Sequence, residues 1–157
     1  MAQFKILNRL YWTPSKLYRA NLKTDSKCWK CLNQGTLIHV FFECPRIKEF
    51  WLAVQDCIER VTGQNIPLDI RLFILGDPSP LKDITPSTHV EWIQTAIMLG
   101  RRLIVQLWKS AHIPLITEWH NLLDRTASYE RVSFSMNGRI DQFHQKWDRF
   151  LLYNSNT

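Results

Sequence analysis

Three of the four cysteines and one of the five histidines lie within a short segment, in the pattern Cys28-x2-Cys31-x7-His39-x4-Cys44. Thiolates and an imidazole nitrogen are the ligands that zinc takes in tetrahedral structural sites, and the two-residue gap lets one tight turn present the first pair. This spacing favours a zinc site over ordinary buried cysteines and a core histidine. Since protein would fill all four positions, the pattern indicates a structural zinc rather than a catalytic one.

Three further residues have predicted roles around these ligands. Gly35 lies in the span that returns the chain to His39, and we expect it to adopt backbone angles that other residues resist. Cys44 directly precedes Pro45, where the N-terminus of a helix would favour a thiolate. Cys57 has no ligand-type residue at a suitable spacing, and we predict a small buried thiol there.

Aromatic and basic residues are interleaved with the predicted ligands. Zinc knuckles bind single-stranded nucleic acid by stacking bases on aromatic rings while cations meet the phosphates. The predicted nucleic-acid contacts are Lys27, Trp29, Lys30, Arg46 and Lys48, together with Arg19 and Lys23 upstream. Phe41 and Phe42 are rings of the same region, but burial of the metal site against the following helix is the favoured role for both.

The positive charge of the chain is concentrated in this region. The whole chain carries a net charge of +6, whereas residues 1–48 hold nine Lys/Arg and two Asp/Glu, a net charge of +7. A polyanionic partner such as RNA or single-stranded DNA would account for this distribution. A solvated surface that keeps the protein in solution accounts for it equally well, so charge alone leaves both interpretations open.

Length and composition are those of a globular protein. The chain has 157 residues, 45% of them hydrophobic, and seven tryptophans, which suits one domain with a substantial core. No apolar run approaches the ~20 residues of a membrane span. Asn8 and Arg9 interrupt the first apolar stretch, so we expect no secretory signal. A reducing, intracellular location, nuclear and/or cytoplasmic, follows as the expectation, and there a cysteine cluster more often holds metal than disulfides.

Hydrophobic periodicity predicts a mainly α fold: a helical domain with a small Cys-Cys-His-Cys zinc knuckle as a non-helical insert near the N-terminus. Helices are expected at about residues 3–11, 14–20, 45–62 and 88–110, then from Pro114 to the Asn137-Gly138 break, and from Ile140 onward. Thr88 and Glu91 form a capping-box pattern. Residues 69–75 are predicted as a strand or extended segment, and residues 77–80 as a turn-rich loop.

The same periodicity predicts which residues face the core. They are Phe4, Leu7, Leu10 and Tyr11 in the first helix; Ile47, Phe50, Trp51, Val54, Ile58 and Val61 in the third; Ile93, Ile97, Gly100, Ile104, Leu107 and Trp108 in the fourth; Trp119, Leu122 and Leu123 in the fifth; and Ile140, Phe143, Trp147, Phe150 and Leu151 in the last. We divide the chain into a basic helical leader (1–26), the zinc knuckle with the start of the next helix (27–50) and a Trp-rich helical tail domain (51–157).

Several stretches resemble a known family. The runs LNRLYWTPSKLYR, CWKC and GTLIHVFFECPRIKEFW resemble the carboxy-terminal region of the reverse-transcriptase polyprotein of LINE-type (non-LTR) retrotransposons of vertebrates, which follows the polymerase and carries a Cys-Cys-His-Cys zinc motif. LDIRLFILGD, LGRRLIVQLWK, ITEWHNLL and GRIDQFHQKWDRFLLY are also similar, so the likeness covers nearly the whole chain. It implies an RNA-binding module with Cys28, Cys31, His39 and Cys44 as zinc ligands, which helps a parent protein engage template RNA or target DNA.

No residues of the chain indicate catalysis. A polymerase holds two magnesium ions on paired aspartates, and the sequence has no Asp-Asp pair. His112, His120 and His144 lie in or beside predicted helices and are expected to be surface or satisfied core histidines. We therefore expect a non-catalytic module with no small-molecule substrate and no membrane partner. Two alternatives stay open: a protein-interaction or scaffold module that docks on a polymerase body, and a non-functional element-derived fragment.

Overall fold

The computed structural model describes residues 2–155, and for residues 2 and 3 only the backbone. Within that range the chain is mainly helical and has no strand, which confirms the predicted fold class. The α-helices are α1 (Ala2–Leu7), α2 (Pro14–Arg19), α3 (Pro45–Thr62), α4 (Ser87–Leu107), α5 (Ile116–Met136) and α6 (Ile140–Ser155), with the short helical turns η1 (His39–Glu43), η2 (Arg71–Leu75) and η3 (Ser79–Leu81) between them.

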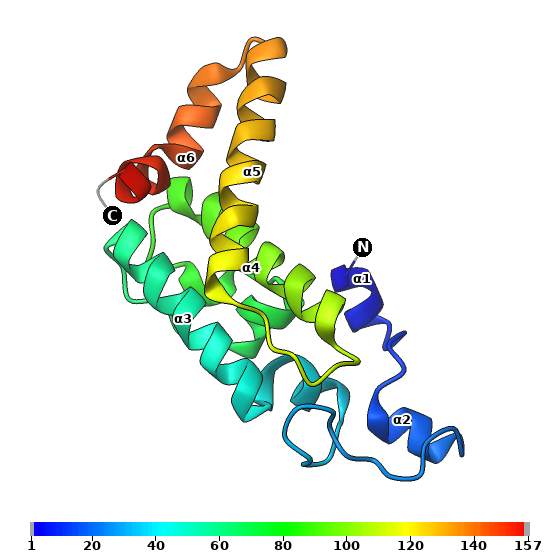
Figure 1. The fold of residues 1–157 in the computed structure, drawn as a ribbon. Helices are drawn as coiled ribbons and strands as arrows, with labels where there is room; N and C mark the ends of the chain where they lie inside the picture. Colours follow the sequence, from blue (N-terminus) through cyan, green and yellow to red (C-terminus); the bar gives the residue numbers. More distant parts are fainter. Residues whose placement is uncertain (1, 156–157) are drawn as a thin grey trace.

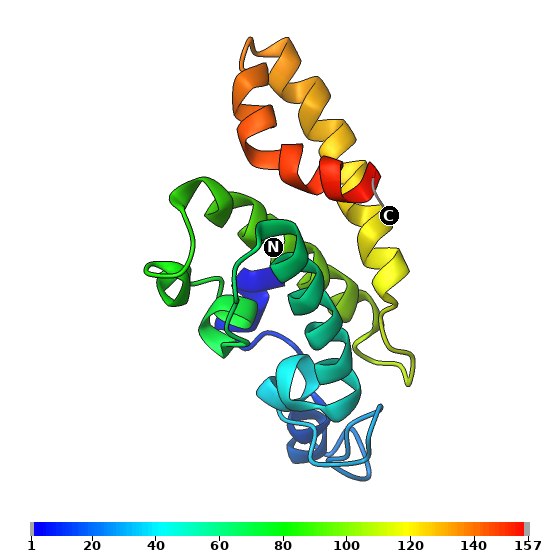
Figure 2. The ribbon, with the colours of Figure 1, turned by 90° about the vertical axis from the view of Figure 1, so that its left-hand side faces the viewer.

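The helices form an elongated molecule with the predicted zinc knuckle near one end. Figures 1 and 2 show α5 and α6 as a hairpin at one end, and α2 with the loop that follows it at the other. The helices α3 and α4 lie between these ends and pack against each other. None of the helices that the structure describes combines the length and the apolar character that a membrane span requires.

Helix α3 has the boundaries and the buried face that its sequence predicts. Pro45 is its first residue, and Gly63 ends it in the left-handed conformation (φ 69°) that suits glycine. All six predicted inward residues, Ile47, Phe50, Trp51, Val54, Ile58 and Val61, are buried. The predicted face of α4 is buried from Ile93 to Ile104, while Leu107 and Trp108 at its end are half-buried.

Three buried tryptophans each donate an indole N–H to a named acceptor. Trp51 donates to the carbonyl of Phe41 (2.9 Å), Trp119 to the carbonyl of Ala96 (2.8 Å) and Trp147 to the carboxylate of Glu130 (2.7 Å). These bonds tie α3 to η1, α5 to α4 and α6 to α5, so the large rings orient neighbouring elements as well as filling space.

The predicted inward face of the first helix is wrong. Three of its four residues, Phe4, Leu7 and Leu10, are each more than half exposed. Tyr11 is buried, as predicted, and Ile6, which the prediction left out, is buried as well. Within the described part of α1 the buried side chain is Ile6, so the helix presents a different face to the core from the predicted one. The helix ends at Leu7 and Arg9 takes a left-handed conformation (φ 51°), so the helical spacing does not continue to residues 10 and 11.

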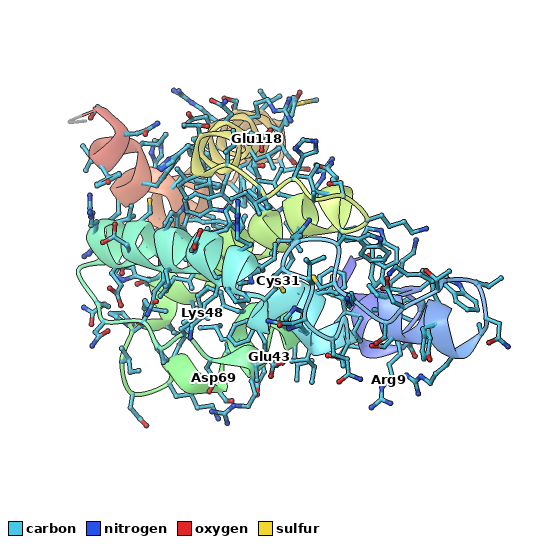
Figure 3. All side chains as sticks on the ribbon, turned by 60° about the horizontal axis from the view of Figure 1, so that its bottom comes forward. Arg9, Cys31, Glu43, Lys48, Asp69 and Glu118 are labelled. Atoms are coloured by element: carbon cyan, nitrogen blue, oxygen red, sulfur yellow. The ribbon has the colours of Figure 1, made fainter. Side chains whose placement is uncertain are left out.

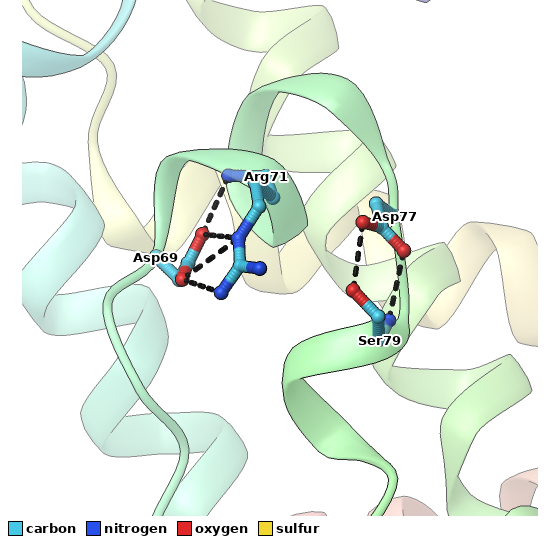
Figure 4. A network of polar contacts seen from close by, with 4 residues as sticks. All are labelled: Asp69, Arg71, Asp77 and Ser79. Carbon is cyan, nitrogen blue, oxygen red and sulfur yellow. Dashed lines mark hydrogen bonds and ion pairs between the residues drawn. The ribbon is translucent and has the colours of Figure 1, made fainter.

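The predicted strand or extended segment at residues 69–75 is also wrong, because η2 is a helical turn. Figure 4 shows how side chains shape it: the Asp69 carboxylate accepts the backbone N–H of Arg71 (2.7 Å) and pairs with its guanidinium (2.7 Å). Gly76 (φ 73°) ends the turn, and Asp77 then accepts two hydrogen bonds from Ser79. A short apolar run does not distinguish a strand from a buried helical turn.

Two smaller differences between the predictions and the structure concern the residues at which α4 and α5 begin. Helix α4 begins at Ser87 with Pro86 before it and no side-chain cap, so the capping box predicted at Thr88 is wrong. Helix α5 begins later than predicted, at Ile116, and there Glu118 accepts the backbone N–H of Leu115 (3.1 Å).

In the last two helices most of the predicted inward residues are buried. Trp119, Leu123, Phe143, Trp147 and Phe150 are buried, Leu122 and Ile140 are half-buried, and Leu151 is 36% exposed. A single hydrophobic core connects all three predicted segments, from Ile6 through Cys28 and Trp51 to Phe150. The division into leader, knuckle and tail stays a prediction.

Candidate metal centre

The structure brings the four predicted ligands together. The Sγ atoms of Cys28, Cys31 and Cys44 and a ring nitrogen of His39 all lie within 4.8 Å of one another. The edges of a tetrahedral zinc–thiolate site are ~3.8 Å, for a Zn–S bond of ~2.3 Å, so a small inward movement would close the four atoms on one ion. Cys31 Sγ and His39 Nε2 already lie 3.1 Å apart. The donor set fits a tetrahedral metal ion. The four side chains would fill every coordination position, so none would be left for a water molecule or a substrate.

A tight turn presents the first two cysteines. The N–H of Cys28 donates to the carbonyl of Asn33 (2.6 Å), and the N–H of Leu32 donates back to the carbonyl of Cys28 (3.2 Å). Leu32 has a left-handed backbone (φ 65°), which reverses the chain after Cys31. The N–H of Lys30 donates to Cys28 Sγ (3.4 Å), which holds this side chain within the turn.

The second half of the centre is helical, which corrects the expectation of a non-helical insert. His39 begins η1, with its N–H donating to the hydroxyl of Thr36 (3.1 Å), and Cys44 closes the turn by donating to the His39 carbonyl (2.8 Å). Since α3 starts at the next residue, His39 and Cys44 are held by continuous backbone hydrogen bonding that leads into the core. Phe41, inside this turn, is fully buried, as predicted, and Phe42 is half-buried.

Gly35 has a different role from the predicted one. Its backbone is not left-handed; instead, a Cβ at this position would lie 2.6 Å from Cγ of Pro14. The Gly35 carbonyl accepts the N–H of Ser15 (3.1 Å), and its own N–H donates to Ser26 (2.8 Å). Glycine is therefore required for the close approach of the knuckle to α2, and not for a special backbone angle.

Burial changes the pKa of two of the four candidate ligands, Cys44 and His39. Cys44 is fully buried, and burial raises its pKa to about 12, although the N–H groups of Ile47 and Arg46 at the start of α3 act in the opposite direction. Burial also lowers the pKa of His39. A metal ion would have to displace the thiol protons, and it would then compensate the buried negative charge.

Cys57 lies in α3, outside the cluster. Its side chain is 5% exposed, and burial raises its pKa to about 11. It is the small buried thiol that the sequence predicts, and it is a natural control for the ligand cysteines.

The structure gives Lys30 a structural position that differs from the predicted one. Its ammonium group donates to the carbonyl of Leu107 (2.8 Å), the last residue of α4, and to the carbonyls of Ser110 (2.6 Å) and His112 (2.6 Å) in the loop that follows. Burial lowers its pKa, while Cys28 and Cys44 act to raise it. Because three carbonyls already accept its three N–H groups, we leave Lys30 out of the candidate nucleic-acid surface. The signal that sequence reasoning missed is that α4 ends without a glycine cap, so its last carbonyls need a cation.

Replacing Lys30 tests this assignment. We expect Lys30→Met to lower the free energy of unfolding by about 2 kcal/mol, because three carbonyls lose a charged donor. Urea denaturation measures the change. The exposed Lys27→Met is the matched control and should shift stability by less than about 0.5 kcal/mol. Equal stability of the two variants would contradict a structural Lys30.

Trp29 is half-buried and packs edge-on against Trp108, with ring centroids 5.5 Å apart. Trp108 also contacts Tyr11 (5.2 Å), which contacts Phe41 (5.0 Å). This chain of four rings joins the knuckle, the end of α4 and the leader, so Trp29 has a packing role whatever else it contacts.

The other predicted nucleic-acid contacts lie at the surface around the knuckle. Lys27, Arg46, Lys48 and Arg19 are exposed, whereas Lys23 forms an ion pair with Asp25. In the view of Figure 3, Lys48 and Arg9 lie to opposite sides of Cys31, so basic side chains flank the candidate centre on two sides.

The histidines outside the cluster are dispersed. His112 is exposed, His120 is half-buried beside Trp119, and His144 is paired with Asp148 (2.8 Å) on the surface of α6. Among the residues that the structure describes, these three share no cluster with other potential metal ligands. In a comparison with models of known protein families, no family model matches the chain.

Proposed function

We propose that this protein is a non-catalytic, zinc-stabilised module that binds RNA or single-stranded DNA, of the kind found in the carboxy-terminal region of LINE-type reverse transcriptases. The observation that carries the proposal is the convergence of Cys28, Cys31, His39 and Cys44 beside exposed cations. Three thiolates and an imidazole suit zinc, and a closed site supplies structure rather than a reactive water.

The charge distribution supports a polyanionic partner. The exposed cations Lys27, Arg46 and Lys48 come from the knuckle and the first turn of α3, so they are attached to ordered backbone on both sides of the four candidate ligands in the sequence. Cations held in this way meet the phosphates of a single strand at a smaller cost in conformational entropy than cations on a mobile tail.

Charge reversal at these residues tests the proposal. We expect Lys27→Glu, Arg46→Glu and Lys48→Glu together to weaken binding of a fluorescent single-stranded RNA by roughly tenfold or more at ~0.15 M salt, because each lost phosphate contact removes counterion release. Fluorescence anisotropy over a series of salt concentrations measures affinity and salt dependence together.

The matched control reverses three exposed cations elsewhere: Lys82→Glu, Arg125→Glu and Arg131→Glu. Both variants lose the same net charge, so a general electrostatic effect would weaken both equally. Unchanged binding by the knuckle variant would contradict the assigned surface. No binding by the unmodified protein at low salt would contradict the nucleic-acid function itself.

A second function has its own supporting observation. The leader exposes large apolar side chains, with Phe4 62%, Leu7 54% and Leu10 51% accessible. Apolar groups exposed together mark surfaces that bind other proteins, which favours a module that docks on the polymerase part of a larger protein. Sedimentation velocity separates the two: an unsatisfied docking face would make the isolated chain self-associate, and Leu7→Lys would then restore the monomer.

A further inference from the structure

A hollow lies beside the knuckle, between α2 and the segment that leads to His39. It has a volume of about 770 Å³. One wall is formed by residues 9–20 of the leader, which include α2, and the other by residues 36–38. Arg9, Lys16 and Arg19 line it, and none of the described lining residues is acidic.

An aromatic ring and a cation share one wall of this groove. Trp12 is 45% exposed, and the Lys16 ammonium lies 4.6 Å from the centroid of its ring while donating to the carbonyl of Arg9 (3.3 Å). The ammonium lies over the ring, so a base would stack on the part of the indole that Lys16 leaves exposed. An exposed indole with a neighbouring cation is the combination that single-strand-binding proteins use for a base and its phosphate. Tyr11 lines the same groove and is also a buried residue of the hydrophobic core, so this part of the groove wall is fixed by core packing.

A polar group inside the groove has no partner. Ser15 is 6% exposed, and its hydroxyl makes no hydrogen bond with any residue that the structure describes. A buried hydroxyl costs free energy unless it is matched, and it would serve as donor or acceptor to a polar ligand in the groove. Its N–H is already used, since it donates to Gly35 on the facing segment.

We infer that this groove, which we call the Trp12 groove (Arg9, Trp12, Ser15, Lys16 and Arg19), holds one unpaired nucleotide of a single strand. Its base stacks on Trp12, its phosphates meet the three cations, and the Ser15 hydroxyl bonds a polar edge. The inference rests on the proposed function and assigns it a site that lies outside the cations of the knuckle and α3. Helix α2 has only six residues, which is too short for its N-terminus to form an anion site. The positive charge of the groove therefore comes from the side chains of Arg9, Lys16 and Arg19.

The test compares two aromatic residues of the same region. We expect Trp12→Ala to weaken binding of an oligouridine strand by roughly tenfold, the effect of losing one base–aromatic stack. Trp12→Phe should retain most of the affinity, because it keeps a ring. Tyr18→Ala is the matched control, since Tyr18 is a half-exposed ring of α2 outside the groove, and it should leave binding unchanged.

Two further measurements separate stacking from charge. A strand with abasic sugars at every position should bind the Trp12→Ala variant and the unmodified protein equally. The triple change Arg9→Gln, Lys16→Gln and Arg19→Gln should lower the log–log salt slope for a single strand by about 2. Circular dichroism melts of each variant verify that the fold is kept.

The outcomes distinguish this inference from the proposed function. If the unmodified protein binds RNA, the knuckle charge reversal weakens it and Trp12→Ala does not, the Trp12 groove is refuted while the proposed function stands. If Trp12→Ala leaves RNA binding unchanged but removes self-association, the groove is a protein interface and the inference is overturned. If no single strand binds at all, both fail.

Discussion

Chelation of the proposed zinc ion is expected to unfold the segment from Lys27 to Cys44 while the helices after Gly63 stay folded. If this segment stayed folded without a metal, the side chains of Cys28, Cys31, Cys44 and His39 would remain clustered with no ion between them. Cys44 would also keep its proton there, because burial raises its pKa to about 12. In small closed sites the free energy of metal binding, on the order of 10 kcal/mol, is also the free energy that holds the local fold. The later helices depend instead on the core around Trp119 and Trp147.

Amide hydrogen exchange of the zinc-loaded and chelated protein measures this effect segment by segment. The N–H groups of Cys28, Leu32 and Cys44 are hydrogen-bonded within the knuckle, so their protection should fall by several orders of magnitude after chelation. Uniform protection with and without the metal would show that the packing of η1 on α3 suffices without zinc.

Two cysteine variants make the same test without a chelator. Cys31→Ser should lose the bound zinc, measured as metal per chain by mass spectrometry, and should show the exchange pattern of the chelated protein. Cys57→Ser is the matched control, because it is the same substitution at a buried cysteine outside the cluster. It should retain one zinc per chain; loss of zinc from both variants would point to general unfolding rather than to a ligand role.

Gly100→Ala is expected to destabilise the protein by about 2–3 kcal/mol, although alanine is the better helix former by ~1 kcal/mol. A Cβ at Gly100 would lie 2.6 Å from Cζ3 and 3.0 Å from Cη2 of Trp51. Trp51 has no room to retreat, because its ring is fully buried, packs edge-on against Phe73 (5.1 Å) and is held by its bond to the Phe41 carbonyl. Overpacking therefore outweighs helix propensity at this position.

A double-mutant cycle identifies the clash as the cause. Trp51→Phe removes the atoms that Gly100→Ala would strike, so the double variant should lose clearly less stability than the sum of the two single variants. Gln106→Ala, at an exposed position of α4, is the control for helix propensity and should change stability by less than about 0.5 kcal/mol. A stabilised Gly100→Ala variant in urea denaturation would contradict the close packing of α4 on α3.

The sequence by itself determines the elements whose information is local. The candidate metal ligands follow from residue type and spacing, so the sequence alone is enough to name Cys28, Cys31, His39 and Cys44. The structure brings these four side chains together. The limits and the buried stripe of α3 follow from Pro45, Gly63 and a helical period, and each is where the sequence predicts it. Long periodic segments carry many independent signals, and this redundancy makes the longer helices predictable.

Only the tertiary structure decides which partner each of the remaining groups meets. Lys30 and Trp29 have the composition of a nucleic-acid contact, yet Lys30 caps the carbonyl end of α4 about eighty residues away, and Trp29 packs on Trp108. Spacing along the chain carries no information about such distant contacts. The Trp12 groove is of the same kind: its walls come from α2 and from residues 36–38, and they approach closely because Gly35 has no side chain to hold Pro14 away.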